Sequence, residues 1–257
     1  MNLYSMDLHI HTVLSPCAEL DMGAPDIITR CSEENIDLIA ITDHNSALNT
    51  EALARSSEGS GVEVICGLEV QSSEDIHVLC LMPNIEKART FEKWVSERLP
   101  HFRNRPDKFG DQFVIDENNK IIDEYEYLLV QGIDATADEV IEKIRSFGGI
   151  SILAHIDRPA YSYVAVLGMI PESLEVDAVE LSAHLSSEEA LQWLGMTGKR
   201  PVIRSSDAHT LKDISLQKTT PALLEKPSFE ELALALKGID GREVLWPWDR
   251  ASPKGLF

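Results

Sequence analysis

The sequence predicts an α/β protein in which strands and helices alternate as they do in a (β/α) barrel. Strand-like apolar runs and helical segments follow one another along most of the chain, and several of those runs end in histidine or a carboxylate. Functional side chains of such barrels gather at the carboxyl ends of the strands, so the two observations agree. Counting the strands does not separate a seven-stranded from an eight-stranded barrel.

The expected strands are short runs of β-branched and other apolar residues. They span Leu3 to Ile10, Ile36 to Ile41, Val62 to Glu69, His77 to Met82, Ile150 to Ala154, Ala178 to Leu181 and Pro201 to Arg204. Helices are expected at Ala24 to Glu34, Asn45 to Ser57, Ile85 to Arg98, Thr136 to Phe147, Ser187 to Leu194 and Ser228 to Lys237. This order of elements is the one that a barrel requires.

Two helix starts have the pattern of a capping box, in which a hydroxyl residue and a glutamate three positions later bond each other's backbone. Thr136 and Glu139 form one such pair, and Gly148-Gly149 ends the helix that follows. Ser228 and Glu231 repeat the arrangement.

Residues 100 to 132 interrupt the alternation. Two short β-like runs between Gln112 and Asp123 flank the turn-forming sequence Asp-Glu-Asn-Asn, which predicts an inserted β-hairpin. Near a barrel mouth such an insertion either shapes substrate access or is a surface elaboration without contact to ligand. We expect residues 1–257 to form a single barrel domain that contains this insertion.

The composition agrees with one globular domain. The chain has 257 residues, 26% charged and 44% hydrophobic, which are ordinary values and argue against disorder. No apolar stretch is long enough to cross a membrane and the N-terminus does not resemble a signal peptide, so we expect a cytoplasmic protein. The cysteines, at positions 17, 31, 66 and 80, lack C-x-x-C spacing, which favours reduced thiols over a disulfide framework.

The formal net charge of −20 bears on the substrate. Binding of duplex nucleic acid depends on lysine and arginine side chains that neutralise phosphates, and an acidic surface opposes it. Bound cations reverse the field locally. The charge therefore disfavours a long nucleic acid and favours a small phosphorylated metabolite or nucleotide.

The run Asp7-Leu-His-Ile-His-Thr is the strongest local signal. Alternate strand residues point to the same side, so His9 and His11 lie together where both rings can bind one metal ion. The competing interpretation is the polar face of an edge strand.

Six of the eight histidines lie at strand boundaries together with carboxylates. The further residues are Asp43, His44, Glu69, His77, His155, Asp207 and His209. Imidazole and carboxylate suit zinc, manganese and iron, and a carboxylate can bridge two ions that clamp the oxygens of a phosphoryl displacement. The set predicts a multinuclear metal hydrolase.

These segments resemble the polymerase and histidinol phosphatase (PHP) superfamily of metal-dependent phosphoesterases. The matching motifs are Asp7-Leu-His-Ile-His-Thr12, Ile41-Thr-Asp-His-Asn45, Gly67-Leu-Glu69, Ala154-His155 and Ser206-Asp-Ala-His209, in the family's order. The resemblance covers residues 7 to 209 and implies a distorted (β/α)7 TIM-like barrel of the PHP type with an inserted β-hairpin.

The resemblance also implies two or three divalent ions (Zn, Mn or Fe). It places His9, His11, Glu69 and Asp207 around a first ion; Glu69, His77 and His155 around a second; and His44 and His209 at a third. Many family members add a histidine at the third ion where this chain has Cys17. That thiol is either a substitute ligand or a small packed residue.

Two further residues are expected to assist catalysis. Asp43 is expected to orient a ligand imidazole by accepting its other ring proton, to cap the helix that follows it, or to do both. Arg158 either grips phosphate through its guanidinium fork or pairs with Asp157 or another nearby carboxylate. Glu180 lies near the end of the strand Ala178 to Leu181 and His184 follows it, so these residues either contact substrate or have no role at the site, and we leave them unassigned.

Together these features predict hydrolysis of a phosphate ester by metal-activated water. Three alternatives remain open: an amidohydrolase that cleaves C–N or carboxylic ester bonds, a noncatalytic metal-binding module, and an exonuclease acting on short oligonucleotides. The sequence does not predict the oligomeric state.

Overall fold

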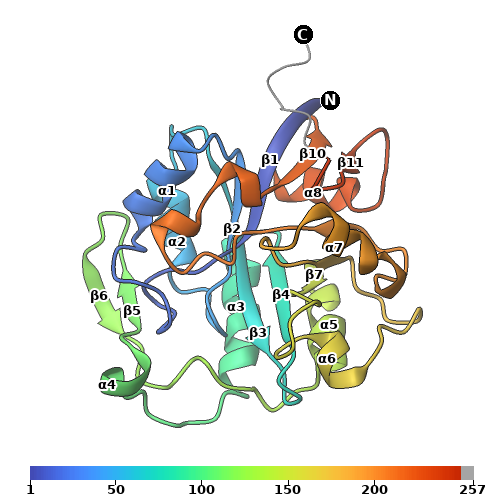
Figure 1. Cartoon of the computed structure of the whole chain (residues 1–257). Coiled ribbons are helices and arrows are strands. Elements are labelled where there is room, and N and C mark those ends of the chain that lie inside the picture. Colours follow the sequence, from blue (N-terminus) through green and yellow to red (C-terminus); the bar gives the residue numbers. More distant parts are fainter. Residues whose placement is uncertain (250–257) are drawn as a thin grey trace.

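The chain forms a strongly curved sheet with helices around its outside (Figure 1). This structure is a computed structural model, and it describes residues 1–249. The nine strands lie in the order β11-β10-β1-β2-β3-β4-β7-β8-β9. The segment after β9 returns to β1, where Ala208 bonds His9 and His11 through the backbone, so the sheet is nearly closed into a barrel. The predicted barrel-type α/β fold is confirmed.

All seven predicted strands are present, with shifts of a few residues at their ends. The sheet comprises β1 (Asn2–Ile10), β2 (Leu38–Ile41), β3 (Glu63–Gln71), β4 (His77–Met82), β7 (Ile150–Leu153), β8 (Ala178–Glu180), β9 (Val202–Ile203), β10 (Thr220–Leu224) and β11 (Glu243–Val244). The last two strands were not predicted. Proline within a run argues against a strand, and Pro221 lies inside β10, which pairs with the first half of β1.

The direction of β4 is important for the site. β1, β2 and β3 are parallel to one another, and so are β7, β8 and β9, but β4 runs antiparallel to both of its neighbours. The first residue of β4 therefore lies at the edge where the parallel strands end. This explains why His77 begins a strand while the other candidate ligands close or follow one.

The helices are α1 (Ala24–Glu33), α2 (Thr50–Ser56), α3 (Ile85–Ser96), α4 (Pro106–Phe109), α5 (Ala137–Ser146), α6 (Tyr163–Leu167), α7 (Ser187–Gln192) and α8 (Phe229–Ala235). Short 3-10 turns follow at Leu194–Met196, Leu211–Asp213 and Leu216–Lys218. The prediction that α2 begins at Asn45 is wrong. Asn45 has a left-handed backbone with φ of 51°, and its side chain bonds other segments, so the chain continues irregularly to Thr50.

The capping box at Thr136 is confirmed, and Ser186 with Glu189 forms another at α7. The box predicted at Ser228 is only half present. Ser228 accepts a bond from the backbone of Glu231, but the Glu231 carboxylate pairs with Arg242 instead of returning to the cap. A distant arginine therefore displaces the local bond.

The strands place apolar side chains in two layers, one inside the barrel and one beneath the helices. Leu8, Leu38, Leu79 and Ile152 belong to the inner cluster, which α8 covers with Leu232. Cys66 and Cys80 are buried, and no disulfide forms among the residues that the structure describes. No helix within residues 1–249 has the length and apolar composition needed to cross a membrane.

The predicted hairpin is confirmed as β5 (Phe113–Ile115) and β6 (Ile121–Glu124), a separate two-stranded sheet. It is fastened to the barrel by Asn49, whose side chain donates to the carbonyl of Phe113 and accepts from the backbone of Ile115. Asn45 likewise donates to the carbonyls of residues 129 and 131. The insertion is thus bonded to the loop that carries His44.

Replacing Asn49 with alanine would leave the backbone groups of Phe113 and Ile115 unpaired in a buried place. We expect the variant to lose about 2 to 3 kcal/mol of unfolding free energy, which urea denaturation measures. Asn118→Ala in the exposed turn of the hairpin is the control, with an expected change within about 0.5 kcal/mol. Equal losses in both variants would contradict the fastening role of Asn49.

Candidate metal centre

Every candidate ligand lies at one edge of the barrel. His9 and the residues just after it end β1, Glu69 lies near the end of β3, His77 begins β4, and His155 and Asp207 follow β7 and β9. The side chains of these residues are buried or nearly so, although they are polar, whereas His209 and Cys17 lie nearer to solvent. Such groups are stable in a core only when they are paired or bind an ion.

Four candidate ligand atoms approach one another in this cluster. The Nε2 atom of His9 lies 3.1 Å from Nε2 of His11 and 3.3 Å from Oε1 of Glu69. Asp207 Oδ1 lies 3.2 Å from both imidazole nitrogens. Ligands of a tetrahedral ion at bond lengths near 2 Å are separated by about 3.3 to 3.6 Å. The observed separations are close to that range, so these side chains are candidates to share one divalent ion.

Glu69 also faces a second group of imidazoles. Its Oε1 atom lies 2.7 Å from Nδ1 of His77 and 3.3 Å from Nε2 of His155. The second nitrogen of each of these two rings is buried without a hydrogen-bond partner among the described residues. Glu69 would therefore be able to bridge two ions. Each of the rings of His77 and His155 also has one such unpaired nitrogen.

His11, His44 and His209 form a third group, with candidate ligand atoms within 4.8 Å of one another. His44 also approaches Glu69, with 3.0 Å between Nδ1 and Oε2. Burial raises the pKa of the Cys17 thiol, but hydrogen bonds with His209 and His44 outweigh this and lower the pKa to about 7. Cys17 is exposed beside these rings, so it is not the packed core residue of the second interpretation.

The charges of the cluster depend on one another. Burial disfavours the ionised Glu69, but His77, His9 and His44 hold its pKa well below the usual value. Burial likewise opposes a charge on His9, yet the nearby carboxylates of Asp207, Glu180 and Glu69 raise the pKa of its ring. The carboxylates thus need positive charge beside them, and a divalent ion supplies it by displacing protons.

Polar groups behind the rings set their orientation. Glu180 Oε2 lies 3.0 Å from Nδ1 of His9 and accepts the backbone N–H of His155 at 3.1 Å. An acceptor at this position favours a proton on Nδ1, so that Nε2, once an ion displaces its proton, would offer its lone pair to that ion. The sequence analysis left Glu180 unassigned, although its place at the end of β8 is the same signal that singled out the ligands.

Asp43 acts on the site through Ser15. The hydroxyl of Ser15 donates to Asp43 at 2.7 Å and lies 3.0 Å from Nδ1 of His11. Asp43 also accepts the backbone N–H and hydroxyl of Thr12. The alternative of a helix cap is wrong, since Asn49 is the cap residue of α2. Nothing in the sequence pattern distinguished Ser15.

Arg158 lies at the mouth of the centre with 38% of its side chain exposed. Its Nη2 atom is 2.6 Å from Oδ2 of Asp207. Asp157 instead accepts the backbone N–H of Ser182. The carboxylate that pairs with Arg158 is therefore that of Asp207 and not that of Asp157.

Several residues at or next to the candidate ligands have a left-handed backbone. Within residues 1–249, nine residues other than glycine have positive φ, among them Asn45, His155, Tyr161 and Asp207. Such conformations persist only where surrounding contacts impose them, and they are common at functional sites.

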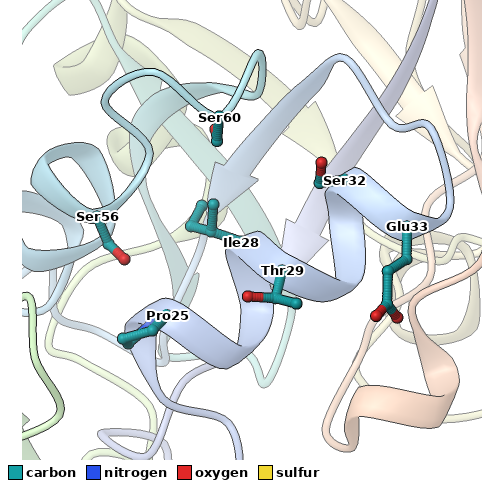
Figure 2. Close-up of a pocket in the computed structure, with 7 residues that line it drawn as sticks. All are labelled: Pro25, Ile28, Thr29, Ser32, Glu33, Ser56 and Ser60. Carbon is teal, nitrogen blue, oxygen red and sulfur yellow. The ribbon is translucent and has the colours of Figure 1, made fainter.

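The hollow in Figure 2 lies elsewhere, between α1 and the end of α2, with a volume of about 430 Å³. Glu33 is the one titratable residue among those that line it. This surface lacks the groups that catalysis requires.

Comparison with known proteins gives the following relatives. Residues 7–180 match the model of the PHP domain family. The uncharacterized protein YqxK of Bacillus subtilis is 26% identical over 206 residues, which cover 74% of this chain and 46% of YqxK. The chain therefore spans about half the length of this relative.

Three solved structures share the fold. The lesion-specific endonuclease EndoQ from Pyrococcus furiosus has a TM-score of 0.63 at 19% identity, over 94% of this chain and 57% of the other. An amidohydrolase from Chromobacterium violaceum has a TM-score of 0.58 at 17% identity, over 95% and 98% of the two chains. A putative metal-dependent phosphoesterase from Bifidobacterium adolescentis has a TM-score of 0.54 at 18% identity, over 79% and 87%. At these identities the likeness shows the fold alone.

The family model covers most of the chain and includes the histidine pair of β1, Glu69 and His155. On that match the chain belongs to the PHP domain family.

Proposed function

We propose that the chain hydrolyses a phosphate ester with water activated by two or three divalent ions, of zinc, manganese or iron. The observation that carries the proposal is the close approach, at 3.1 to 3.3 Å, of the His9 ring to His11, Glu69 and Asp207 and of Asp207 to His11. Bound ions lower the pKa of a coordinated water and stabilise the negative charge that develops on the phosphoryl and leaving oxygens.

The proposed ligands fall into three groups that share members. The first ion is held by His9, His11, Glu69 and Asp207; the second by Glu69, His77 and His155; the third by His44, His209 and Cys17, beside His11. The geometry supports Glu69 as the shared ligand, because its Oε1 atom lies beside His9 of the first group and beside His77 and His155 of the second. Thiolate and imidazole together suit zinc at the third position.

Arg158 is the proposed contact for the phosphate of the substrate. Its exposed guanidinium lies beside the ligand Asp207, and a guanidinium binds two phosphate oxygens at once. Asp43 has a positioning role, since it holds Ser15 against His11.

The proposed substrate is a small phosphorylated metabolite or nucleotide. The net charge of −20 disfavours a long polyanion. In the basic loop, Arg103 pairs with Glu126 and Arg105 pairs with Asp107, which lessens its attraction for an oligonucleotide. A nucleic acid is the second candidate substrate, since a structural neighbour, Endonuclease Q, has been solved with a 27-mer duplex.

The amidohydrolase reaction is an alternative, because the amidohydrolase from Chromobacterium violaceum shares the fold of this chain. Release assays on matched phosphate esters and amides separate the two reactions. A noncatalytic module would bind ions without turnover of either substrate.

Removal of the ions should abolish phosphate release. We expect a chelator to reduce turnover by at least about 100-fold, and zinc, manganese or ferrous iron to restore it, because the activated water depends on the ion. Phosphate release with elemental analysis of the same samples is the measurement. Full turnover in protein freed of metal would refute the mechanism.

Replacing Glu180 with alanine removes the acceptor that orients His9. We expect metal affinity at the first position to fall by about 10- to 100-fold, with a matching loss of turnover at limiting metal. Competition with a chromogenic chelator measures the affinity, and Glu188→Ala on the exposed face of α7 is the control. Unchanged affinity in Glu180→Ala would show that His9 needs no such support.

A further inference from the structure

An aromatic ring stands at the edge of the metal centre. The ring of Tyr161 stacks on the ring of His77, with centroids 4.7 Å apart and an angle of 25° between the planes. His77 in turn contacts Glu69. Tyr161 nevertheless remains 47% exposed. A large part of this residue therefore faces solvent while its ring lies against His77, a proposed ligand.

The backbone holds this ring in place at an energetic cost. Tyr161 has φ of 58°, a left-handed conformation that is rarely adopted by a bulky residue. Its carbonyl accepts the N–H of His77 at 3.0 Å. The next residue, Ser162, donates to the carbonyl of Arg158 and accepts from Ala165 to cap α6. The loop is thus fixed on both sides of the tyrosine.

Arg158 and Tyr161 share this loop and approach the cluster from different sides. Arg158 contacts Asp207, and Tyr161 contacts His77. One supplies an exposed cation for a phosphate and the other an exposed ring face. A cation and a ring face are the two groups that a molecule joining a phosphate to a planar ring can use.

We propose that Tyr161 stacks on a planar ring carried by the phosphate ester, such as a nucleobase or an aromatic alcohol. The inference rests on the proposed phosphoesterase function and narrows its substrate class. Base–aromatic stacking in nucleic-acid-binding proteins corresponds to roughly 5- to 150-fold in affinity per base. The competing role, a cover that shields His77 from water, would act equally on planar and nonplanar substrates.

The test compares two phosphonates of the same charge, benzylphosphonate and cyclohexylmethylphosphonate. The two compounds have similar size, and neither contains a scissile ester bond. Only benzylphosphonate carries a planar ring. Isothermal titration calorimetry on the metal-loaded protein gives both dissociation constants. We expect the wild-type protein to bind benzylphosphonate about tenfold more tightly than the cyclohexyl compound.

Variants of the protein then test whether Tyr161 causes the preference for the planar ring. Tyr161→Leu should bring the ratio of the two dissociation constants close to one, whereas Tyr161→Phe should keep it within about twofold of wild type. Tyr4→Leu, at the opposite end of β1, is the matched control and should keep the ratio. The ratio cancels any common loss from weaker metal binding.

A wild-type ratio near one, a failure to bind either phosphonate, or a ratio that Tyr161→Leu leaves unchanged would overturn the inference. A phosphate-release assay on phenyl phosphate separates this result from the proposed function. Turnover without a planar preference contradicts the role of Tyr161 alone, whereas a planar preference without turnover contradicts the phosphoesterase alone.

Discussion

Five imidazoles meet at the buried carboxylate of Glu69, and the rest of the site is arranged around that meeting point. Its oxygens lie 2.7 to 3.5 Å from nitrogen atoms of His9, His11, His44, His77 and His155. β3, which carries Glu69, is the middle strand of the nine-stranded sheet. A carboxylate at this place reaches ligands from both halves of the barrel. Without positive charge it would be an unpaired buried anion, which a protein core does not tolerate.

The barrel and the candidate ligands could be predicted because their signals are local. Apolar runs mark the strands, and histidine or a carboxylate at a strand end marks the active edge. His77 fitted this rule only after the antiparallel direction of β4 was known. The PHP family membership was likewise inferable, since its motifs are short and ordered along the chain.

The remaining features depend on contacts between distant segments. Ser15 matters because of the ring that it touches, and nothing in its own neighbourhood reveals that. Glu180 ends a strand as the ligands do, but its contact with His9 comes from a segment far away in the sequence. The start of α2 was misplaced because Asn45 bonds the insertion and Gln71 instead of continuing a helix. β10 was not predicted because Pro221 lies within it and proline argues against a strand, although the segment pairs with β1.

The candidate ligands lie at different depths, with two of those of the first ion deepest and two of those of the third ion nearer to solvent, as Arg158 is. His9 and His11 are fully buried, whereas Arg158, His209 and Cys17 lie toward solvent. Anomalous diffraction from crystals of the metal-loaded protein tests the central claim most directly. The account predicts an ion between His9, His11, Glu69 and Asp207 and a second beside Glu69, His77 and His155. Crystals with bound metal elsewhere and no anomalous density at Glu69 would contradict it.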